Sequence, residues 1–477
     1  MAQTAQIKEF VAPQNDTQRV FMQQKAAYRA NPYPSYAQRM DSLAKLEALI
    51  HDNADAIAAA ISRDFGHRSV IETKLVEIFS SLSGIRDARK KLKKWMKPQK
   101  RHVSILFATG KNRVLPQPKG LVGVVTPWNY PLFLSIGPIV SALAAGNRCM
   151  VKLATNSDNL CRLLQKLCAE AFGDDLVAFL PGVRGSEFTS LPFDHIIYTG
   201  SAESGRTVMK AAAENLCPVT LELGGKSPTI VCDDFDLKEA AQRLLYTKFL
   251  NAGQTCIAPD YLFLPEGKVD EFVAHAKRIV GGRYPDIDEP SYTSVIDGPS
   301  FTRLRETLDD AVNKGATAIK LVDGNFNSEL RKFPPHLVVN VSQDMRLLQD
   351  EIFGPLLPVM TYRSLDEVLD YINQRDRPLA LYAFTHNKQI QAKIVHNTMS
   401  GGVLFNNCVF HALQHDLPFG GVGASGMGHY HGYEGFLEFS KLRPVFNFPK
   451  FGKPDLFYPP YTRAHEKLYS LLNKFKL

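Results

Sequence analysis

The sequence predicts an α/β protein in which short parallel strands alternate with helices and which has more than one domain. Three observations support this prediction. The chain has 477 residues, which is too long for a single hydrophobic core. Apolar runs bounded by turn residues alternate with helical patterns between residues 121 and 223. The same alternation begins again after Gly225, so we expect a second α/β unit.

The first hundred residues are predicted to be helical. After Asp41, apolar residues recur at three- and four-residue steps until Gly66, which is typical of a helix end. A second helix is expected from about residue 72 to residue 95. The stretch RVLPQPKG, which ends at Gly120, is rich in proline and is expected to be an extended connection.

The following segments fit a doubly wound parallel sheet. The predicted strands are 121–125, 149–153, 195–198 and 218–223, and the predicted helices are 132–145, 159–172 and one that opens at GSAESG. Such alternation is typical of a sheet covered by helices on both faces, the layout of nucleotide-binding domains. The second unit starts with the strand SPTIVC and the helix 236–250, and it continues to about Asn407.

Composition and charge argue against several classes of protein. The net charge of +8, with 22% charged residues, is modest for this length and does not favour a nucleic-acid-binding protein. The densest basic run, Arg86 to Arg101, is interpreted as a solvated helix face, with an anionic binding surface as the alternative. The apolar stretch 133–146 is too short and too interrupted to span a bilayer.

The cysteines favour a reducing compartment. There are seven, an odd number, and no two have C-x-x-C spacing, so neither a disulfide framework nor a metal site is indicated. No signal peptide is recognisable, and we expect a cytoplasmic protein. Residues 467–477 form a basic amphipathic pattern. We expect this segment to dock on its own protein or on a partner subunit, with a membrane surface as the alternative.

Two features suggest a phosphate-binding edge of the first sheet. Gly200 and Gly205 follow a predicted strand and open a predicted helix, and the free N–H groups of a helix N-terminus bind phosphate. The spacing departs from G-x-G-x-x-G, and it also arises by chance. Lys152 ends another strand, where ligands collect in open α/β sheets, or it is simply solvated.

Three residues are candidates for chemistry. Cys256 lies among small and polar residues in NAGQTCIAPD. It is either a reactive thiol in an open polar environment or a structural cysteine buried as a small apolar residue. Glu222 alternates with apolar residues in PVTLELGGKSP. It either faces water or points into a dry cleft, where its pKa would rise and it would suit a general base. Asn129 in TPWNYP either shapes a turn or directs its amide at a developing negative charge.

Taken together, the motifs resemble those of the aldehyde dehydrogenase superfamily. The matching motifs are TPWNYP, YTGSAESG, LELGGKSP, NAGQTCIAPD, DEIFGPLLPV, NNC and PFGGVGASGMGHYHGYEGF. They cover most of the chain and look most like the branch with class 3, fatty-aldehyde and coniferyl-aldehyde dehydrogenases. The resemblance implies NAD(P)-dependent oxidation of an aldehyde, either aromatic or medium-to-long aliphatic, to the carboxylic acid.

The same resemblance implies a domain plan. It consists of a Rossmann-like parallel-sheet coenzyme domain, a second α/β catalytic domain and a small β arm for oligomerisation. The implied boundaries are 1–97 and 118–224 for the coenzyme domain, 225–412 for the catalytic domain, 98–117 and 413–445 for the arm, and 446–477 for a C-terminal extension. A homodimer is expected rather than a tetramer.

Residue roles are also carried over from the resemblance. Cys256 would be the nucleophile and Glu222 the general base, while Asn129 and the Cys256 backbone N–H would form the oxyanion hole. The residues implied to bind coenzyme are Thr126, Pro127, Trp128, Lys152, Thr155, Gly200, Ser201, Gly205, Leu223, Gly224, Glu351 and Phe353. Tyr130 and Phe410 are candidate apolar walls of the substrate pocket, or else plain core residues.

One position departs from the family pattern. Where the family often has a glutamate that binds the adenosine ribose, this chain has Thr155 in KLATN. A carboxylate there repels the 2′-phosphate of NADP and a threonine does not, so NADP is expected to be accepted. Two other interpretations stay open. One is an acylating enzyme that passes its thioester to coenzyme A, against which Glu222 argues, and the other is a non-catalytic member of the fold.

Overall fold

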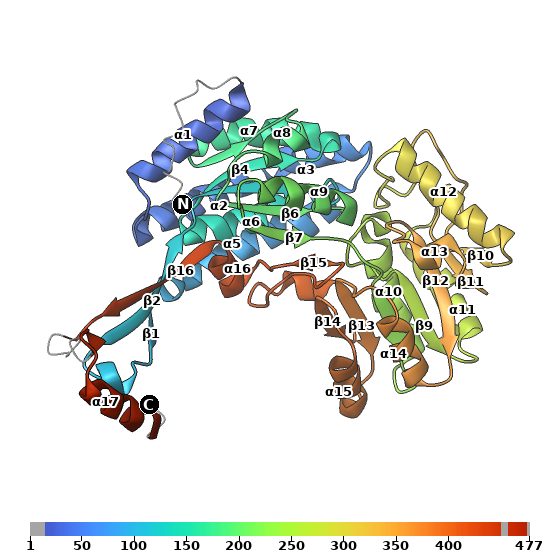
Figure 1. Ribbon diagram of the computed structural model, residues 1–477. Coiled ribbons are helices and arrows are strands. Elements are labelled where there is room, and N and C mark those ends of the chain that lie inside the picture. Colours follow the sequence, from blue (N-terminus) through green and yellow to red (C-terminus); the bar gives the residue numbers. More distant parts are fainter. Residues whose placement is uncertain (1–14, 450–456, 475–477) are drawn as a thin grey trace.

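A computed structural model describes residues 15–449 and 457–474, which form two α/β domains and a β arm (Figure 1). Residues 1–14, at the start of the predicted coenzyme domain, and residues 450–456 and 475–477, in the predicted extension, lie outside the described residues. The α/β fold class predicted from the sequence is confirmed by the two mainly parallel sheets.

The first domain is built on a six-stranded sheet with the order β15-β7-β6-β3-β4-β5. Its strands are β3 (Leu121–Thr126), β4 (Arg148–Leu153), β5 (Val177–Phe179), β6 (His195–Thr199), β7 (Val219–Glu222) and β15 (Gly426–Met427). All pairs are parallel except β15 with β7. Val122 and Val124 pack into one apolar cluster and Leu121 into another, so both faces of the sheet are buried.

Helices cover this sheet. They are α1 (Asp16–Ala30), α2 (Tyr36–Asp52), α3 (Ala54–Phe65), α4 (Val70–Thr73), α5 (Phe79–Trp95), α6 (Phe133–Ala145), α7 (Asp158–Phe172), α8 (Gly185–Thr189), α9 (Ala202–Ala213) and α16 (Gly432–Glu438). A π-helical turn at Lys74–Ile78 joins α4 to α5. Helix α2 begins five residues before the predicted start because Ser35 and Gln38 form a capping box there. The sequence interpretation missed α1 and the short strand β5.

The second domain is built on a seven-stranded sheet with the order β10-β11-β12-β9-β8-β13-β14. Its strands are β8 (Pro228–Val231), β9 (Tyr261–Pro265), β10 (Thr317–Lys320), β11 (His336–Val339), β12 (Leu356–Tyr362), β13 (Ala380–Phe384) and β14 (Gly402–Phe405). Its helices are α10 (Leu237–Phe249), α11 (Val269–Arg283), α12 (Gly298–Asn313), α13 (Arg346–Gln349), α14 (Leu365–Asn373) and α15 (Lys388–Asn397). Only the edge strand β10 is antiparallel to its neighbour.

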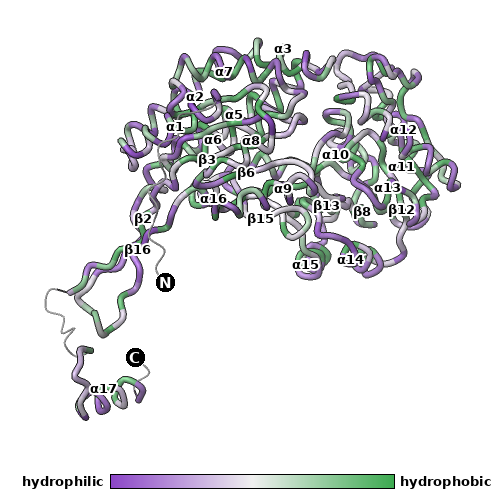
Figure 2. Tube along the Cα trace, turned by 45° about the horizontal axis from the view of Figure 1, so that its top comes forward, coloured by the Kyte–Doolittle hydropathy of each residue, from purple (hydrophilic) through white to green (hydrophobic). Residues whose placement is uncertain are grey.

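The arm is a three-stranded antiparallel sheet of β1 (Gln99–Arg101), β2 (Lys111–Pro118) and β16 (Ser440–Asn447). It projects away from both domains, and helix α17 (Arg463–Lys474) lies near its far end in Figures 1 and 2. None of the α17 residues is buried. Among the described residues, no helix is both long enough and apolar enough to cross a membrane.

The predicted arm segment 413–445 divides in the structure, which corrects that boundary. Strand β15 adds to the edge of the first sheet beside β7, and α16 packs against α5 and α6. Only β16 lies in the arm, where its eight residues pair with β2. The buried Phe436 and Phe439 explain the difference, because they draw the segment before β16 into the core of the first domain.

Candidate active site

A cavity of about 450 Å³ lies between the two α/β domains. From the first domain it is lined by Pro127, Trp128, Asn129, Thr199, Gly200, Ser201, Glu222, Leu223 and Gly224. From the second domain it is lined by Cys256, Ser300, Arg303, Thr307, Arg346, Asp350, Glu351, Ile352 and Phe353. Eleven of the predicted site residues therefore meet in one cavity, including Cys256, Glu222 and Asn129.

The strands of the first domain place their residues at this cavity. Asn129 follows β3, Gly200 and Ser201 lie between β6 and α9, and Glu222 is the last residue of β7. Because these strands are parallel, their carboxyl ends meet at one edge of the sheet, where ligands bind in open α/β folds.

Cys256 lies in the loop between α10 and β9 and is partly exposed to the cavity. The loop begins with a short helical turn in which Asn251 and Ala252 both have φ of 52°, a strained region for residues other than glycine. Burial, and then the charges of Glu351 and Glu222, raise the pKa of the Cys256 thiol to about 12. Without a further positive charge, the sulfur therefore keeps its proton at neutral pH.

Glu222 is buried in the cavity wall, with 2% of its surface exposed. Neither carboxyl oxygen has a hydrogen-bond partner among the described residues. Burial, and then the charge of Glu438, raise the pKa of Glu222 well above its ordinary value. A carboxyl group with a raised pKa is a stronger base than a solvated one, and Glu222 lines the cavity between the domains.

Asn129 is buried beside the cysteine loop. Its side-chain Nδ2 donates to the main-chain carbonyl of Gln254 at 3.2 Å. Its own main-chain carbonyl accepts one hydrogen bond from Arg68 and one from Asn251, both at 3.0 Å. An amide nitrogen carries two hydrogens, so the second hydrogen on Nδ2 remains available for an oxyanion in the cavity.

Glu351 lines the cavity from the second domain, in the loop after α13, and hydrogen bonds hold this loop in place. Its Oε1 accepts a hydrogen bond from the Gly225 N–H at 3.1 Å. Burial, and then Asp260, raise the pKa of Glu351 to about 8. Arg303 donates to the carbonyl of Ile352 at 2.9 Å. Phe353, at φ 46°, sets its ring edge-on to Trp128 with 5.5 Å between the ring centres.

These residues fit a nicotinamide dinucleotide. Gly200 and Ser201 stand at the N-terminus of α9, whose twelve residues leave free N–H groups for a phosphate. A side chain at Gly224 would collide with the carboxylate of Glu351, so the glycine leaves room for that carboxylate at the cavity wall. The Glu351 carboxylate suits ribose hydroxyl groups, and Phe353 suits a planar ring.

Six predicted site residues do not line this cavity. Thr126 is buried at the end of β3, Gly205 packs in α9 against Leu223, and Thr155 is exposed just after β4. Lys152 donates to the carbonyl of Leu153 at 3.0 Å. The last two are the predicted apolar walls. Tyr130 is buried and its hydroxyl shares a hydrogen bond with Thr255 Oγ1 at 2.8 Å, and Phe410 stacks on Tyr246.

The sequence interpretation missed several lining residues. Thr199, Ser300, Arg303, Thr307, Arg346, Asp350 and Ile352 were not predicted. Most of them lie on α12, on α13 or near its end, where single polar residues on a helix carry no distinctive pattern. No group of three or more His, Cys, Asp or Glu side chains could hold a metal ion among the described residues.

Comparison with known proteins decides the family. The model of the aldehyde dehydrogenase family matches residues 3–445. The chain belongs to the aldehyde dehydrogenase family. It is 50% identical over 457 residues to the "Probable coniferyl aldehyde dehydrogenase" of Pseudomonas aeruginosa, covering 95% of each chain. It is 43% identical over 441 residues to the coniferyl aldehyde dehydrogenase of a Pseudomonas species, covering 91% of each.

The fold of this aldehyde dehydrogenase agrees with that membership. The structure entitled "Substrate bound state of Staphylococcus Aureus AldH" superposes with a TM-score of 0.90 at 32% identity, covering 96% of this chain and 100% of the other. The resemblance inferred from the motifs is thereby confirmed, and so is the prediction of an enzyme that oxidises an aldehyde with NAD(P).

Proposed function

We propose that this aldehyde dehydrogenase oxidises an aromatic aldehyde of the coniferyl type, and that Cys256, Glu222 and Asn129 perform the chemistry. The observation that carries the assignment of residues is the single cavity that all three line. The substrate class is supported by 50% identity, over 95% of the chain, to a protein named "Probable coniferyl aldehyde dehydrogenase". Medium- and long-chain aliphatic aldehydes are the alternative substrates.

The residues divide the reaction into two halves. When bound, the oxidised nicotinamide supplies a positive charge and a hydride acceptor. The Cys256 thiolate, stabilised by the peptide N–H groups of Cys256 and Ile257, attacks the aldehyde carbon and gives a thiohemiacetal. Asn129 Nδ2 and the Cys256 N–H donate to its oxyanion. Loss of hydride leaves a thioester on Cys256.

Hydrolysis of that thioester is the task of Glu222. Its carboxylate takes a proton from water, whose oxygen attacks the thioester carbon and releases the carboxylic acid and the Cys256 sulfur. The buried and unpartnered carboxyl oxygens of Glu222 suit this role, because a solvated carboxylate is a much weaker base. An enzyme that passed the acyl group to coenzyme A would not need such a base.

We also propose that the enzyme accepts NADP as well as NAD. Thr155 is exposed directly after β4, and no carboxylate replaces it in the turn Thr155–Ser157. Lys152, three residues earlier and near the end of β4, supplies a positive charge. A phosphate near these residues would meet attraction and no repulsion from a glutamate.

The arm supports a homodimer. Strand β16 is an edge of the three-stranded sheet, and Leu442 and Phe446 on it are exposed. An exposed apolar edge strand is usually protected by pairing. We propose that two copies of the chain pair through this edge. We also propose that the enzyme works in the cytoplasm, because its seven unpaired cysteines stay reduced there. Sedimentation of the purified enzyme measures the subunit number.

A panel of aldehydes tests the proposed substrate. Coniferaldehyde, benzaldehyde, hexanal, decanal and succinic semialdehyde are each assayed at 340 nm with NAD and with NADP. The highest kcat/KM is expected for coniferaldehyde, with activity from both coenzymes. A preference for decanal would transfer the assignment to aliphatic aldehydes, and a strict need for coenzyme A would replace the hydrolytic mechanism with the acylating one.

A further inference from the structure

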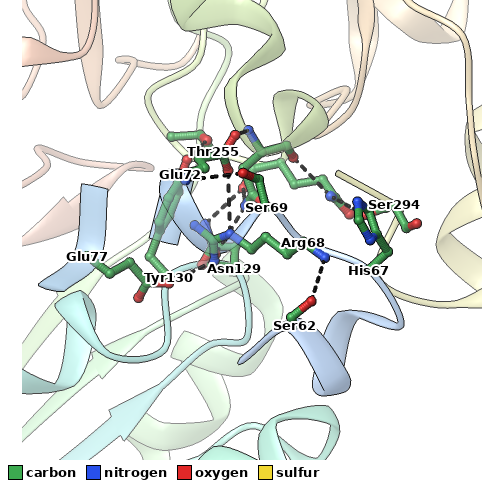
Figure 3. Close-up of polar contacts among 12 residues, drawn as sticks. Ser62, His67, Arg68, Ser69, Glu72, Glu77, Asn129, Tyr130, Thr255 and Ser294 are labelled. Carbon is green, nitrogen blue, oxygen red and sulfur yellow. Dashed lines mark hydrogen bonds and ion pairs between the residues drawn. The ribbon is translucent and has the colours of Figure 1, made fainter. Parts of the chain in front are cut away.

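A fully buried arginine stands behind the proposed oxyanion site. Arg68 lies in the loop between α3 and α4 with 1% of its surface exposed, and Figure 3 shows it among polar residues of both domains. Its Nη1 donates to Glu77 Oε1 at 2.7 Å and to the main-chain carbonyl of Asn129 at 3.0 Å. It does not line the cavity, so it cannot act on the substrate directly.

Each partner of Arg68 holds a different part of the loop that carries Asn129. Glu77 Oε2 accepts the N–H groups of Leu132 at 2.9 Å and Phe133 at 3.0 Å, and so fixes the start of α6. The guanidinium lies over the ring of Tyr130, 4.8 Å from its centre. The segment from Asn129 to Phe133 is therefore bound at its first residue, its second residue and its end.

The same cluster also reaches the loop of Cys256. Glu72, an ion-pair partner of Arg68 Nε at 3.4 Å, accepts the N–H of Asn251 at 3.3 Å. Asn251 Nδ2 in turn donates to the carbonyls of Asn129 and Gln254. The hydroxyl of Tyr130 meets Thr255, the residue before Cys256, at 2.8 Å. The two halves of the oxyanion hole thus share one buried network.

We infer that Arg68 is a positioning residue for this oxyanion site. By fixing the peptide carbonyl of Asn129, and through Glu77 and Tyr130 the turn that follows, it aims the free hydrogen of Asn129 Nδ2 at the oxygen of the carbonyl group that Cys256 attacks. The three buried charged groups, Arg68, Glu72 and Glu77, are costly to desolvate. A hydrogen-bonded network of this kind makes a site rigid, and catalysis needs fixed donors. The inference rests on the proposed role of Asn129.

The test compares Arg68→Met with a double variant, Arg68→Met/Glu77→Gln. The glutamine removes the unpaired charge of Glu77 but still accepts the N–H groups of Leu132 and Phe133. The double variant is therefore expected to recover part of any lost thermal stability, since Glu72 also loses its ion-pair partner. Arg39→Met is the matched control, since Arg39 is also buried and also donates to a main-chain carbonyl, that of Ala144, away from the cavity. Arg68→Lys replaces Arg68→Met in the comparison if the latter does not fold.

Four quantities are measured for each variant: kcat for aldehyde oxidation, the rate of p-nitrophenyl acetate hydrolysis, the calorimetric Kd for coenzyme, and Tm. Both reactions pass through an oxyanion. We expect both rates to fall together by about 10- to 100-fold in the double variant, with the Kd for coenzyme within about twofold of wild type. Arg39→Met should lower Tm alone.

A stable double variant with both rates near wild type would overturn the inference, and so would an equal loss of coenzyme binding, which indicates general disorder of the site. Asn129→Ala separates this failure from that of the proposed function. If Asn129→Ala loses both activities and the double variant does not, only the role of Arg68 is wrong. If Asn129→Ala is fully active, the assignment of Asn129 itself is wrong.

Discussion

The side-chain amide of Asn129 donates to the main-chain carbonyl of Gln254 at 3.2 Å, and Gln254 lies two residues before Cys256. The asparagine and the cysteine loop come from different domains, so this bond joins the two halves of the proposed oxyanion hole. Its geometry leaves one amide hydrogen free, and the proposed mechanism depends on that hydrogen.

Removal of this donor is expected to slow the chemical steps. Asn129→Ala should lower kcat by about 10²- to 10³-fold, the usual effect of removing one oxyanion donor, and should change the Kd for coenzyme little. Steady-state assays at 340 nm and calorimetry measure the two quantities. Asn129→Asp gives a second check, because a carboxylate has no hydrogen to donate and should be no more active than alanine.

Replacement of the nucleophile is expected to abolish oxidation. Cys256→Ser should reduce kcat by about a thousandfold or more, because a serine hydroxyl is a far weaker nucleophile than a thiolate. Intact-protein mass spectrometry after incubation with aldehyde and coenzyme should show an acyl adduct on the wild type only. Cys217→Ser is the control: Cys217 is buried and donates only to the carbonyl of Pro218. Full activity of Cys256→Ser would contradict the mechanism.

Glu222→Gln should separate the two halves of the reaction. The variant is expected to keep the first half of the reaction, in which hydride is transferred to the coenzyme. Stopped-flow absorbance should therefore show a burst of reduced coenzyme close to the enzyme concentration. Steady-state turnover should then fall by about 10²- to 10⁴-fold as the thioester accumulates. Because the pKa of Glu222 is raised, the fraction of deprotonated Glu222 increases as pH rises, and the rate of thioester hydrolysis by the wild type should increase with it. The Glu222→Gln variant should lose this pH dependence. Absence of the burst would place Glu222 in the first half of the reaction.

The raised pKa of Glu351 predicts a stability effect with a defined sign. The carboxyl has an ordinary pKa of 4.5 and a folded value of about 8. Between these two values the folded state binds the proton and the unfolded state does not, so stability falls as pH rises from 4.5 to 8. Glu351→Gln should therefore raise Tm relative to wild type more at pH 8 than at pH 5 in the coenzyme-free enzyme. The exposed Glu306→Gln serves as control, and an equal difference at both pH values would refute the prediction.

The coenzyme proposal is tested at Thr155. Thr155→Glu introduces a carboxylate just after β4 and should lower kcat/KM for NADP by about tenfold or more through charge repulsion, with NAD affected less. Thr155→Gln has a similar size and no charge, so it should leave the ratio of the two coenzymes near that of wild type. Equal effects of Glu and Gln would show that charge at this position does not select the coenzyme.

The sequence was sufficient for features whose evidence is local. Apolar runs such as 121–125 became β3, and Cys256, Glu222 and Asn129, which their motifs predicted as candidates, line one cavity in the structure. Features that depend on contacts between residues far apart in the chain could not be predicted. Arg68 meets the carbonyl of Asn129, 61 positions away, and nothing in the surrounding residues marks that arginine as buried. The two-residue strand β15 is likewise too short to leave a period-two pattern.

Strand β15 has a consequence for how the polypeptide is made. It is contributed by residues 426 and 427 of a 477-residue chain, yet it completes the sheet next to β7, the strand that ends in Glu222. When only the chain up to the second domain has emerged from the ribosome, β15 is still missing and β7 is an open edge of its sheet. Early release or truncation before residue 426 would leave that edge free to pair with another nascent chain, so aggregation rather than a stable shortened enzyme is the expected fate of such products.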